Sequence, residues 1–353
     1  MTFIADLHLD LAMNAIEWNR DLRRPVAELR QRERGRADKP DRGRGAVSLP
    51  DMRRGGVGLC VATQIARVER AAWSPVFGWH SPAQAWAMTQ AQLAWYRAME
   101  EAGELVQIRN RAGLERHLAR WDGAGPIGYV LSLEGADSLS TPAHLERAYA
   151  QGLRAIGPAH YGPGAYAMGT DAEGGLPPAG RELLREVARL GLILDLTHLN
   201  DACFWEALEH HDGPVWASHQ NCRALVPGGR QFSDEQLREV IARGGIVGAA
   251  LDAWMLVPGW VRGQTTPASS GVALRHVVDQ VDHVCQLAGN ARHAAIGSDL
   301  DGAFGTEQTP LDLDTIADLS RLPALLAERG YEAAEIEGIC AGNLLRALRA
   351  ALP

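Results

Sequence analysis

Several side chains that can bind a metal ion stand where short apolar runs of the sequence end. His8 and Asp10 follow the first run, and an extended chain places residues two apart on the same face. A single His-x-Asp pair is weak evidence, and a single acid such as Glu134 could equally stand beside a helix N-terminus. Two histidines that close consecutive apolar runs, as His198 and His219 do, are much less expected by chance. The full set is His8, Asp10, Glu134, His160, His198, His219 and Asp299.

The chemistry that this set predicts is hydrolysis at a pair of metal ions. Imidazole and carboxylate donors suit Zn²⁺, although Mn²⁺, Co²⁺ and Fe²⁺ accept the same ligands. We predict that His8, Asp10 and Glu134 bind one ion. A second ion about 3.5–4 Å away would bind Glu134, His198 and His219, so that Glu134 bridges the pair. A hydroxide between such ions is available near neutral pH, because the metals lower the pKa of water to about 7.

The elements that must position these residues are eight apolar runs, which we expect to be β-strands. They are Phe3–Leu7, Gly58–Ile65, Ile127–Leu133, Leu153–Ala159, Leu192–Thr197, Val215–Ser218, Ile246–Leu251 and Ala294–Ser298. Helical patterns separate several of them, at Pro142–Ala150, at Ala179–Leu190 and from a capping box at Ser233 to Gly244. Eight strand–helix units favour the α/β class and a closed (β/α)8 barrel of the TIM type. Its strand ends would bring the donors together.

Two regions interrupt this alternation. Residues 14–54 are rich in arginine, with glycine, proline and aspartate interspersed, and we interpret them as a partly irregular insertion after the first strand. Residues 79–103 form a long helical segment, and the spacing of its Trp86 and Trp95 is more typical of core packing than of a ligand site. We expect one barrel domain over residues 1–353.

Composition excludes several other classes. The net charge of −8 is unfavourable for a nucleic-acid partner, and no apolar run is long enough to span a membrane. The five cysteines form no Cys-x-x-Cys pair and no secretion signal is recognisable, so we expect a cytoplasmic location. Lys39 is the only lysine and stands in an Arg-rich loop, so we do not expect a carbamylated lysine to bridge two metals, and any bridging ligand must be a carboxylate.

Seven motifs together resemble the membrane dipeptidase (renal dipeptidase) family of zinc peptidases. They occur in the family's order and span nearly the whole chain, although no single motif would suffice. The motifs are Asp6-x-His8-x-Asp10, Leu133-Glu134-Gly135, Ala159-His160, Asp195-x-Thr197-His198, Ser218-His219-x-Asn221-x-Arg223, Gly297-Ser298-Asp299-x-Asp301-Gly302 and Gly342-Asn343-Leu344-Leu345-Arg346. Without a recognisable signal, a lipid-anchor tail or paired cysteines, the chain is most similar to a bacterial cytoplasmic branch.

The resemblance implies a dipeptidase with two zinc ions bridged by Glu134, and a homodimer. It implies that His160 contacts the substrate carbonyl or its oxyanion, and that Asp299 takes a proton from the attacking water and passes it to the leaving amine. Arg230 would hold the terminal carboxylate of a small dipeptide, with Arg223 as the alternative residue. Since family members commonly accept a D-residue at the C-terminal side, L-Xaa-D-Xaa dipeptides are expected substrates.

Two other functions stay open at this point. A cyclic amidase, lactonase or deaminase on the same barrel would need the same metal site, and the carboxylate clamp Arg230 separates it from a dipeptidase. A non-catalytic barrel that keeps its metal ligands as a scaffold is disfavoured by Asp299, because metal binding alone does not require an acid there. The segment Pro158–Pro163 and the long insertion differ from the family's mammalian members, and both bear on side-chain specificity.

Overall fold

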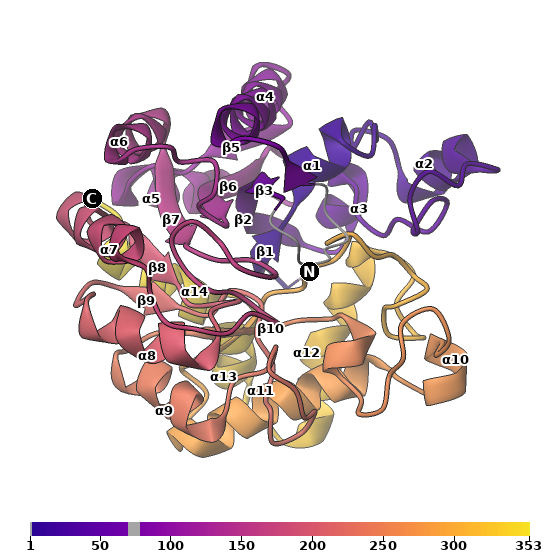
Figure 1. Ribbon diagram of the computed structural model, residues 1–353. Helices are drawn as coiled ribbons and strands as arrows, with labels where there is room; N and C mark the ends of the chain where they lie inside the picture. Colours follow the sequence, from indigo (N-terminus) through magenta and orange to yellow (C-terminus); the bar gives the residue numbers. More distant parts are fainter. Residues whose placement is uncertain (1, 70–77) are drawn as a thin grey trace.

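Parallel strands occupy the middle of the molecule and helices surround them (Figure 1). The computed structural model describes residues 2–69 and 78–353. Hydrogen-bonded neighbours follow the order β10-β11-β1-β2-β6-β7-β8-β9, and a parallel bridge from Ala217 to Val247 links the region after β9 to β10. The barrel strands are β1 (Ile4–Leu9), β2 (Val57–Ile65), β6 (Ile127–Glu134), β7 (Leu153–Gly157), β8 (Ile193–Asp195), β9 (Val215–Trp216), β10 (Val247–Ala249) and β11 (Ala294–Ile296).

This nearly closed eight-stranded barrel confirms the predicted α/β barrel class. Each of the eight predicted runs overlaps one barrel strand, because strands covered by helices appear in the sequence as continuous apolar stretches. Every residue of β1, β2 and β6 is buried. The helices between barrel strands include α4 (Pro82–Glu101), α5 (Arg111–Arg120), α6 (Pro142–Gln151), α7 (Pro178–Leu190), α8 (Asp201–Glu209), α9 (Asp234–Ala242) and α11 (Leu274–Ala288).

The remaining helices lie in the segments that follow β1, β10 and β11. Segment 14–54 contains the end of α1 (Leu11–Ile16), α2 (Val26–Glu33) and α3 (Leu49–Arg54), and α2 lies at the edge of the molecule in Figure 1. The loop after β10 contains η1 (Ala253–Met255) and α10 (Pro267–Ser270). The chain after β11 forms η2 (Ile316–Arg321), α12 (Leu322–Arg329), α13 (Ala333–Glu337), a π-helical turn η3 (Gly338–Gly342) and α14 (Asn343–Ala351).

Several predicted boundaries were wrong. The helix expected from Trp79 begins at Pro82, because Ser81 caps it by accepting a hydrogen bond from the Gln84 N–H at 3.3 Å. Strands 192–197 and 215–218 are shorter than predicted, since Asp195 Oδ1 accepts the main-chain N–H groups of Thr197 and Ser218 in place of ladder bonds. The prediction also missed β5 (Leu105–Gln107), which pairs with β6, and the short pair β3 (Arg67–Val68) and β4 (Gly78–Trp79).

A buried apolar cluster lies among the earlier residues of the barrel strands. It includes Leu7 of β1, Val61 of β2 and Val130 of β6, and residues of α14 such as Leu348 pack against it. Trp86 and Trp95, by contrast, pack at the edge of the larger core between the strands and the surrounding helices, as expected for core residues. In the described part of the chain, no helix is long and apolar enough to cross a lipid bilayer.

Candidate active site

The seven predicted donor residues meet where the barrel strands end. Glu134, the last residue of β6, stands at the centre of the group. Its Oε1 lies 3.3 Å from His198 Nε2 and 3.4 Å from His219 Nε2, and its Oε2 lies 3.6 Å from His8 Nε2. Three groups hold ligand atoms within 4.8 Å of one another, namely His8–Asp10–Glu134, Glu134–His160–His198 and His8–His219–Asp299. Each predicted donor belongs to at least one of them.

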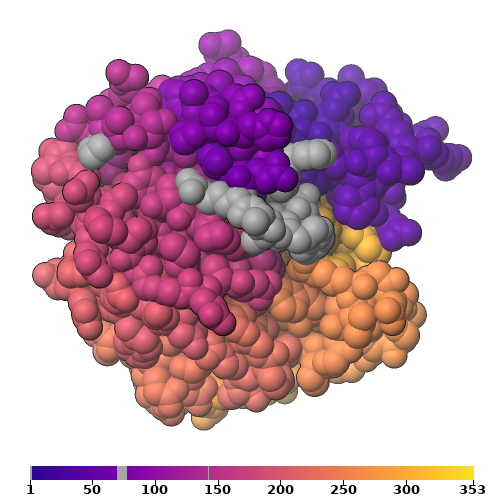
Figure 2. Space-filling model, viewed as in Figure 1, coloured from indigo at the N-terminus to yellow at the C-terminus, as the bar shows by residue number. Residues whose placement is uncertain are grey.

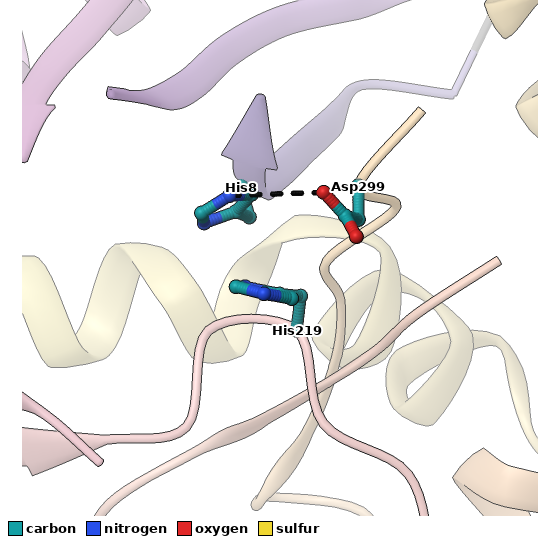
Figure 3. Close-up of side chains that lie close together, drawn as sticks. All are labelled: His8, His219 and Asp299. Carbon is teal, nitrogen blue, oxygen red and sulfur yellow. Dashed lines mark ion pairs between the residues drawn. The ribbon is translucent and has the colours of Figure 1, made fainter. Parts of the chain in front are cut away.

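The loops after the strands bring the last donors into place. His219 follows β9 and Asp299 follows β11, and both side chains face His8 of β1 (Figure 3). The ring centres of His8 and His219 are 3.8 Å apart, and Asp299 Oδ1 lies 3.8 Å from His8 Nε2. His198 and Asp299 adopt left-handed backbone angles, with φ of 70° and 56°, which non-glycine residues rarely adopt outside constrained sites.

Hydroxyl groups orient the imidazole rings from behind. His198 Nδ1 lies 3.0 Å from Thr170 Oγ1, and His219 Nδ1 lies 2.9 Å from Ser218 Oγ. The same hydroxyl is 3.3 Å from His8 Nδ1. With each Nδ1 directed to a hydroxyl, the Nε2 atoms turn toward Glu134, the arrangement by which partner groups fix histidine ligands of metals.

The inward-facing atoms fit metal ions better than they fit one another. His8 Nε2 is buried without a hydrogen-bond partner, although such atoms in native proteins are usually paired. His198 Nε2 and His219 Nε2 face each other at 3.1 Å, and two imidazole lone pairs repel unless a proton or a cation lies between them. Three imidazoles and two carboxylates are a donor set that suits zinc and related divalent cations.

Buried negative charge surrounds His8. Burial opposes its protonation, but Glu134, Asp10 and Asp299 outweigh that effect and raise the pKa of His8 to about 10. Burial and the negative charge of Glu134 raise the pKa of Asp10 to about 6. Burial also raises the pKa of Asp299 well above its ordinary value, and Asp10 and Glu134 add to this effect. The site therefore favours the entry of positive charge, either as protons or as metal ions.

The other histidines are kept neutral. Burial lowers the pKa of His198 and of His219 well below the usual range, and the positive charge of Arg230 acts in the same direction on both. Burial, assisted by Arg67 and Arg230, lowers the pKa of His160 to about 4. Neutral imidazole is the form that binds metals or accepts a proton.

The two candidate arginines differ in where they point. Arg230 is 4% exposed, lines the same pocket as the donors, and donates to Gln220 Oε1 at 2.8 Å and to the His219 carbonyl at 2.9 Å. Arg223 is not among the pocket-lining residues; it forms an ion pair with Asp201, with N–O distances of 2.7 and 2.9 Å. Of the two, only Arg230 can meet a ligand in the pocket.

Sequence reasoning missed four side chains that line the pocket: Tyr161, Asp252, Met255 and Arg262. A signal for Asp252 was present, since it directly follows the predicted strand Ile246–Leu251, just as the other acids follow theirs. Asp252 is buried, accepts a hydrogen bond from Trp254 Nε1 at 2.6 Å, and pairs with Arg262 at 3.6 Å. The other three stand in loops and carry no periodic signal.

The barrel and its convergent donors are those of a metal-dependent hydrolase. The family model described as membrane dipeptidase (peptidase family M19) matches residues 1–352. The chain belongs to this family, which confirms the resemblance seen in the sequence, and it is a hydrolase of the metallo-dipeptidase type.

Three relatives are 28–31% identical to parts of this chain. A protein from the pqqA 5′ region of Klebsiella pneumoniae is 31% identical over 257 residues, which cover 70% of this chain and 89% of that protein. An uncharacterized dipeptidase of Schizosaccharomyces pombe is 28% identical over 62% of this chain and 52% of its own length. Dipeptidase tcpJ of Claviceps purpurea is 28% identical, with 72% and 57% covered. The chain thus spans little more than half the length of the two fungal relatives.

Solved structures share the fold over the full length. A metallopeptidase named dipeptidase AC has a TM-score of 0.80 at 24% identity, with 99% of both chains covered. A metallopeptidase from Rhodobacter sphaeroides, solved with a phosphinate mimic of the dipeptide L-Ala-D-Ala, has a TM-score of 0.78 at 23% identity, with 99% of this chain and all of that chain covered.

Proposed function

We propose that this protein is a dipeptidase that holds two zinc ions, cleaves the amide bond of small dipeptides and accepts a D-residue at the C-terminal side. The observation that carries the proposal is the position of Glu134. Its two carboxylate oxygens lie 3.3–3.6 Å from the Nε2 atoms of His8, His198 and His219. One carboxylate placed between two sets of donors is the arrangement that a bridging ligand requires.

We propose that the residues that would hold the metal ions divide into two sets that share Glu134. His8 and Asp10 would bind one ion together with Glu134, whose Oε2 lies 3.6 Å from His8 Nε2, and His198 and His219 would bind the other ion near Glu134 Oε1. When bound, the two ions would supply the Lewis acidity that makes a water molecule nucleophilic near neutral pH. The hydroxyl groups behind the rings would keep the Nε2 atoms directed inward during each turnover.

Arg230 would select the substrate by its free carboxyl terminus. A guanidinium pairs with a carboxylate through two parallel hydrogen bonds, and the burial of Arg230 protects this pairing from competing water. His160 lies beside Glu134 and His198, where it would hydrogen-bond the oxygen of the scissile carbonyl. A cyclic amidase, lactonase or deaminase would use the same donors but has no free terminus to read, so Arg230 favours the dipeptidase.

Asp299 would transfer a proton from the attacking water to the departing amine. Its carboxylate faces His8, and burial together with neighbouring negative charge raises its pKa well above the ordinary value. A carboxyl group with a raised pKa accepts a proton from water more readily than a free aspartate does. The protonated acid then stands ready to donate to the departing amine nitrogen, which is a poor leaving group without that proton.

Support for a D-residue at the C-terminal side comes from the structural neighbour that binds the L-Ala-D-Ala mimic. The pocket residues that would contact this side chain include Tyr161 and Met255. The chirality preference of this chain would depend on their shape and on the loop Pro158–Pro163, which differs from the family's mammalian members.

A dipeptide-library screen with metal analysis on the same sample tests the proposal. We expect close to two zinc equivalents per chain, hydrolysis of L,D-dipeptides, and loss of activity on chelation that added zinc restores. N-acetylated amino acids and C-terminally amidated dipeptides are matched controls, and the amides should be poor substrates because they lack the carboxylate. A metal-replete preparation that cleaves none of the L,L- or L,D-dipeptides would rule out the peptidase.

Two further expectations accompany the proposal. We expect a homodimer, which analytical ultracentrifugation would detect, and a cytoplasmic location, which cell fractionation would detect. The five cysteines are all buried and free, which is compatible with a reducing compartment.

A further inference from the structure

We propose that Arg20, in the Arg-rich segment 14–54, is a positioning residue that holds the turn carrying Asp299 through the buried carboxylate of Asp301. The inference goes beyond the proposed function and rests on the role that it gives to Asp299. Among the described residues, segment 14–54 contributes no side chain to the lining of the pocket. Segment 14–54 would therefore act on the reaction indirectly, by holding Asp299 in position.

Arg20 is a buried cation whose guanidinium nitrogens all have acceptors. It is 3% exposed, and its Nε and Nη2 donate to the two oxygens of Glu33 at 2.8 and 3.2 Å. Nη2 also donates to Asp41 at 2.8 Å. Nη1 donates to Asn14 Oδ1 at 2.7 Å and reaches Asp301 Oδ2 at 3.5 Å. These contacts fix the guanidinium plane, so that Asp301 meets a cation with little freedom to move.

The same segment binds Asp301 by its main chain as well. Asp301 is 1% exposed, and its two carboxylate oxygens accept the N–H groups of Ala46 at 2.7 Å and Val47 at 3.0 Å. Asn14 Nδ2 donates to the carbonyl of Asp301 at 2.8 Å and to the carbonyl of Asp10 at 3.1 Å. In Figure 2 the indigo N-terminal segment borders yellow C-terminal chain on the surface.

The turn that is held in this way has an unfavourable backbone. Asp299, Asp301 and Ala303 have φ of 56°, 62° and 63°, which are left-handed angles that favour glycine. Gly302 lies so close to the Asp299 carboxylate that a Cβ atom at this position would collide with it. Such a backbone persists only where surrounding contacts determine it, and these sites are commonly functional.

Contacts hold the turn from two sides. On one side, the Asp299 N–H donates to the carbonyl of His8 at 3.2 Å, which ties the turn to β1. On the other side stands the Arg20–Asp301 contact. Without Arg20, Asp301 would keep a buried negative charge without its cation, and the turn would relax. The Asp299 carboxylate would then lose its defined position, 3.8 Å from His8 Nε2.

Kinetics of three variants test the inference. Arg20→Gln removes the cation, and Asp301→Asn removes the charge that it meets while keeping the side-chain shape. Arg30→Gln is the matched control, since Arg30 belongs to the same segment but pairs with Asp314 and the Gly45 carbonyl. We expect kcat to fall about 10- to 100-fold in the first two variants, with KM and zinc content unchanged, because misplacing a reacting group slows the chemical step. The control should behave like the wild type.

The double variant sharpens this test. Arg20→Gln/Asp301→Asn should lose no more activity than the worse single variant, because both residues act through one contact. Additive losses, an unchanged kcat in the single variants, or loss of zinc together with activity would each overturn the inference. If Arg20→Gln does not fold, the isosteric Asp301→Asn decides by its split between kcat and KM.

Amide hydrogen exchange provides a readout that needs no substrate. Peptides covering residues 298–304 should exchange about tenfold faster in Arg20→Gln, because the turn opens locally, and should not change in Arg30→Gln. Unchanged exchange in Arg20→Gln overturns the inference even if the enzyme is slow. If the wild-type protein cleaves no dipeptide, the proposed function fails, whereas the exchange measurement still decides whether Arg20 holds the turn.

Discussion

The same barrel strands carry two contrasting environments only a few residues apart. In the middle of the strands, Leu7, Val61 and Val130 are fully buried in an apolar cluster that also includes residues of α14. Toward the strand ends, His8 and Glu134 are also buried, but among charged groups. Both layers are buried, so burial alone does not explain why one is apolar and the other charged. The first layer stabilises the barrel, whereas the second holds like charges that oppose folding unless cations enter.

This contrast explains why the catalytic end needs so much support from outside the barrel. Apolar side chains pack in many arrangements with similar energy, but a metal donor must hold its atom in place to within about 0.5 Å. Hydroxyl groups such as Ser218 Oγ orient the rings, and the left-handed turn at Asp299 is held by neighbouring segments. The barrel strands therefore bring the donors to one end of the barrel, and contacts from the loops fix the positions of the donor atoms.

The largest effect is expected from removing the carboxylate of Glu134, which is proposed to bridge the two metal ions. Glu134→Ala should lose both metal ions and lower kcat/KM by more than about 10³-fold, well beyond the 10- to 100-fold cost of losing a partner behind a ligand. Metal analysis of the dialysed protein together with dipeptide kinetics checks this. Retention of one full metal equivalent would show that Glu134 does not bridge.

A substitution of Asp299, the residue proposed to carry the proton, should separate the chemical step from metal binding. Asp299→Asn keeps the side-chain shape but cannot take a proton, so we expect kcat to fall about 10²- to 10⁴-fold with both metal ions still bound. Because Asp299 also faces His8 and His219, metal loss equal to that of Glu134→Ala would instead identify Asp299 as a ligand.

A substitution in the apolar layer should have the opposite signature. Leu348 of α14 is fully buried, and Leu348→Ala leaves a cavity beneath the strands that should lower the free energy of unfolding by about 2–5 kcal/mol. Under conditions where the variant is folded, kcat and zinc content should match the wild type. Denaturant titration followed by kinetics measures both quantities, and a large fall in kcat would contradict the division into two layers.

The smallest expected effect concerns the substrate carboxylate. Arg230→Ala should raise KM for dipeptides about 10- to 100-fold, as expected for a lost charge-assisted hydrogen-bond pair, with a smaller change in kcat. The control Arg223→Ala removes a partly exposed pair with Asp201 and should change KM by less than about fivefold. Since Arg230 also bonds the His219 carbonyl, zinc analysis must accompany the kinetics. Equal effects of the two variants would count against Arg230 as the clamp.

The fold was largely predictable because its signal is local. An apolar run bounded by polar residues predicts a buried strand without knowledge of its neighbours, and each of the eight runs overlaps a barrel strand. Strand ends were predicted less well, since they depend on distant side chains such as Asp195, whose Oδ1 accepts the N–H of Ser218 just after β9. Strand β5 was missed because only Leu105 of its three residues is buried, so the segment forms no apolar run.

In the candidate site, too, some features have a local sequence signal and others depend on distant residues. The position of a donor directly after an apolar run is local, so the sequence was enough to select His8, Glu134, His198 and His219, and consistent use of the same rule would have added Asp252. The choice between Arg230 and Arg223 required tertiary structure, because both lie in one loop and only packing decides which guanidinium enters the pocket. The contact between Arg20 and Asp301 joins residues 281 positions apart, and no local pattern encodes it.

By itself, then, the order of residues determined the class of barrel and the chemical types of the donors at its mouth, since hydrophobic periodicity and residue identity are properties of short segments. Tertiary structure alone decided the distances between those donors, which nitrogen each imidazole directs inward, and which neighbours hold Asp299 in its turn. These depend on contacts between distant segments, and such contacts exist only after the chain has closed into the barrel.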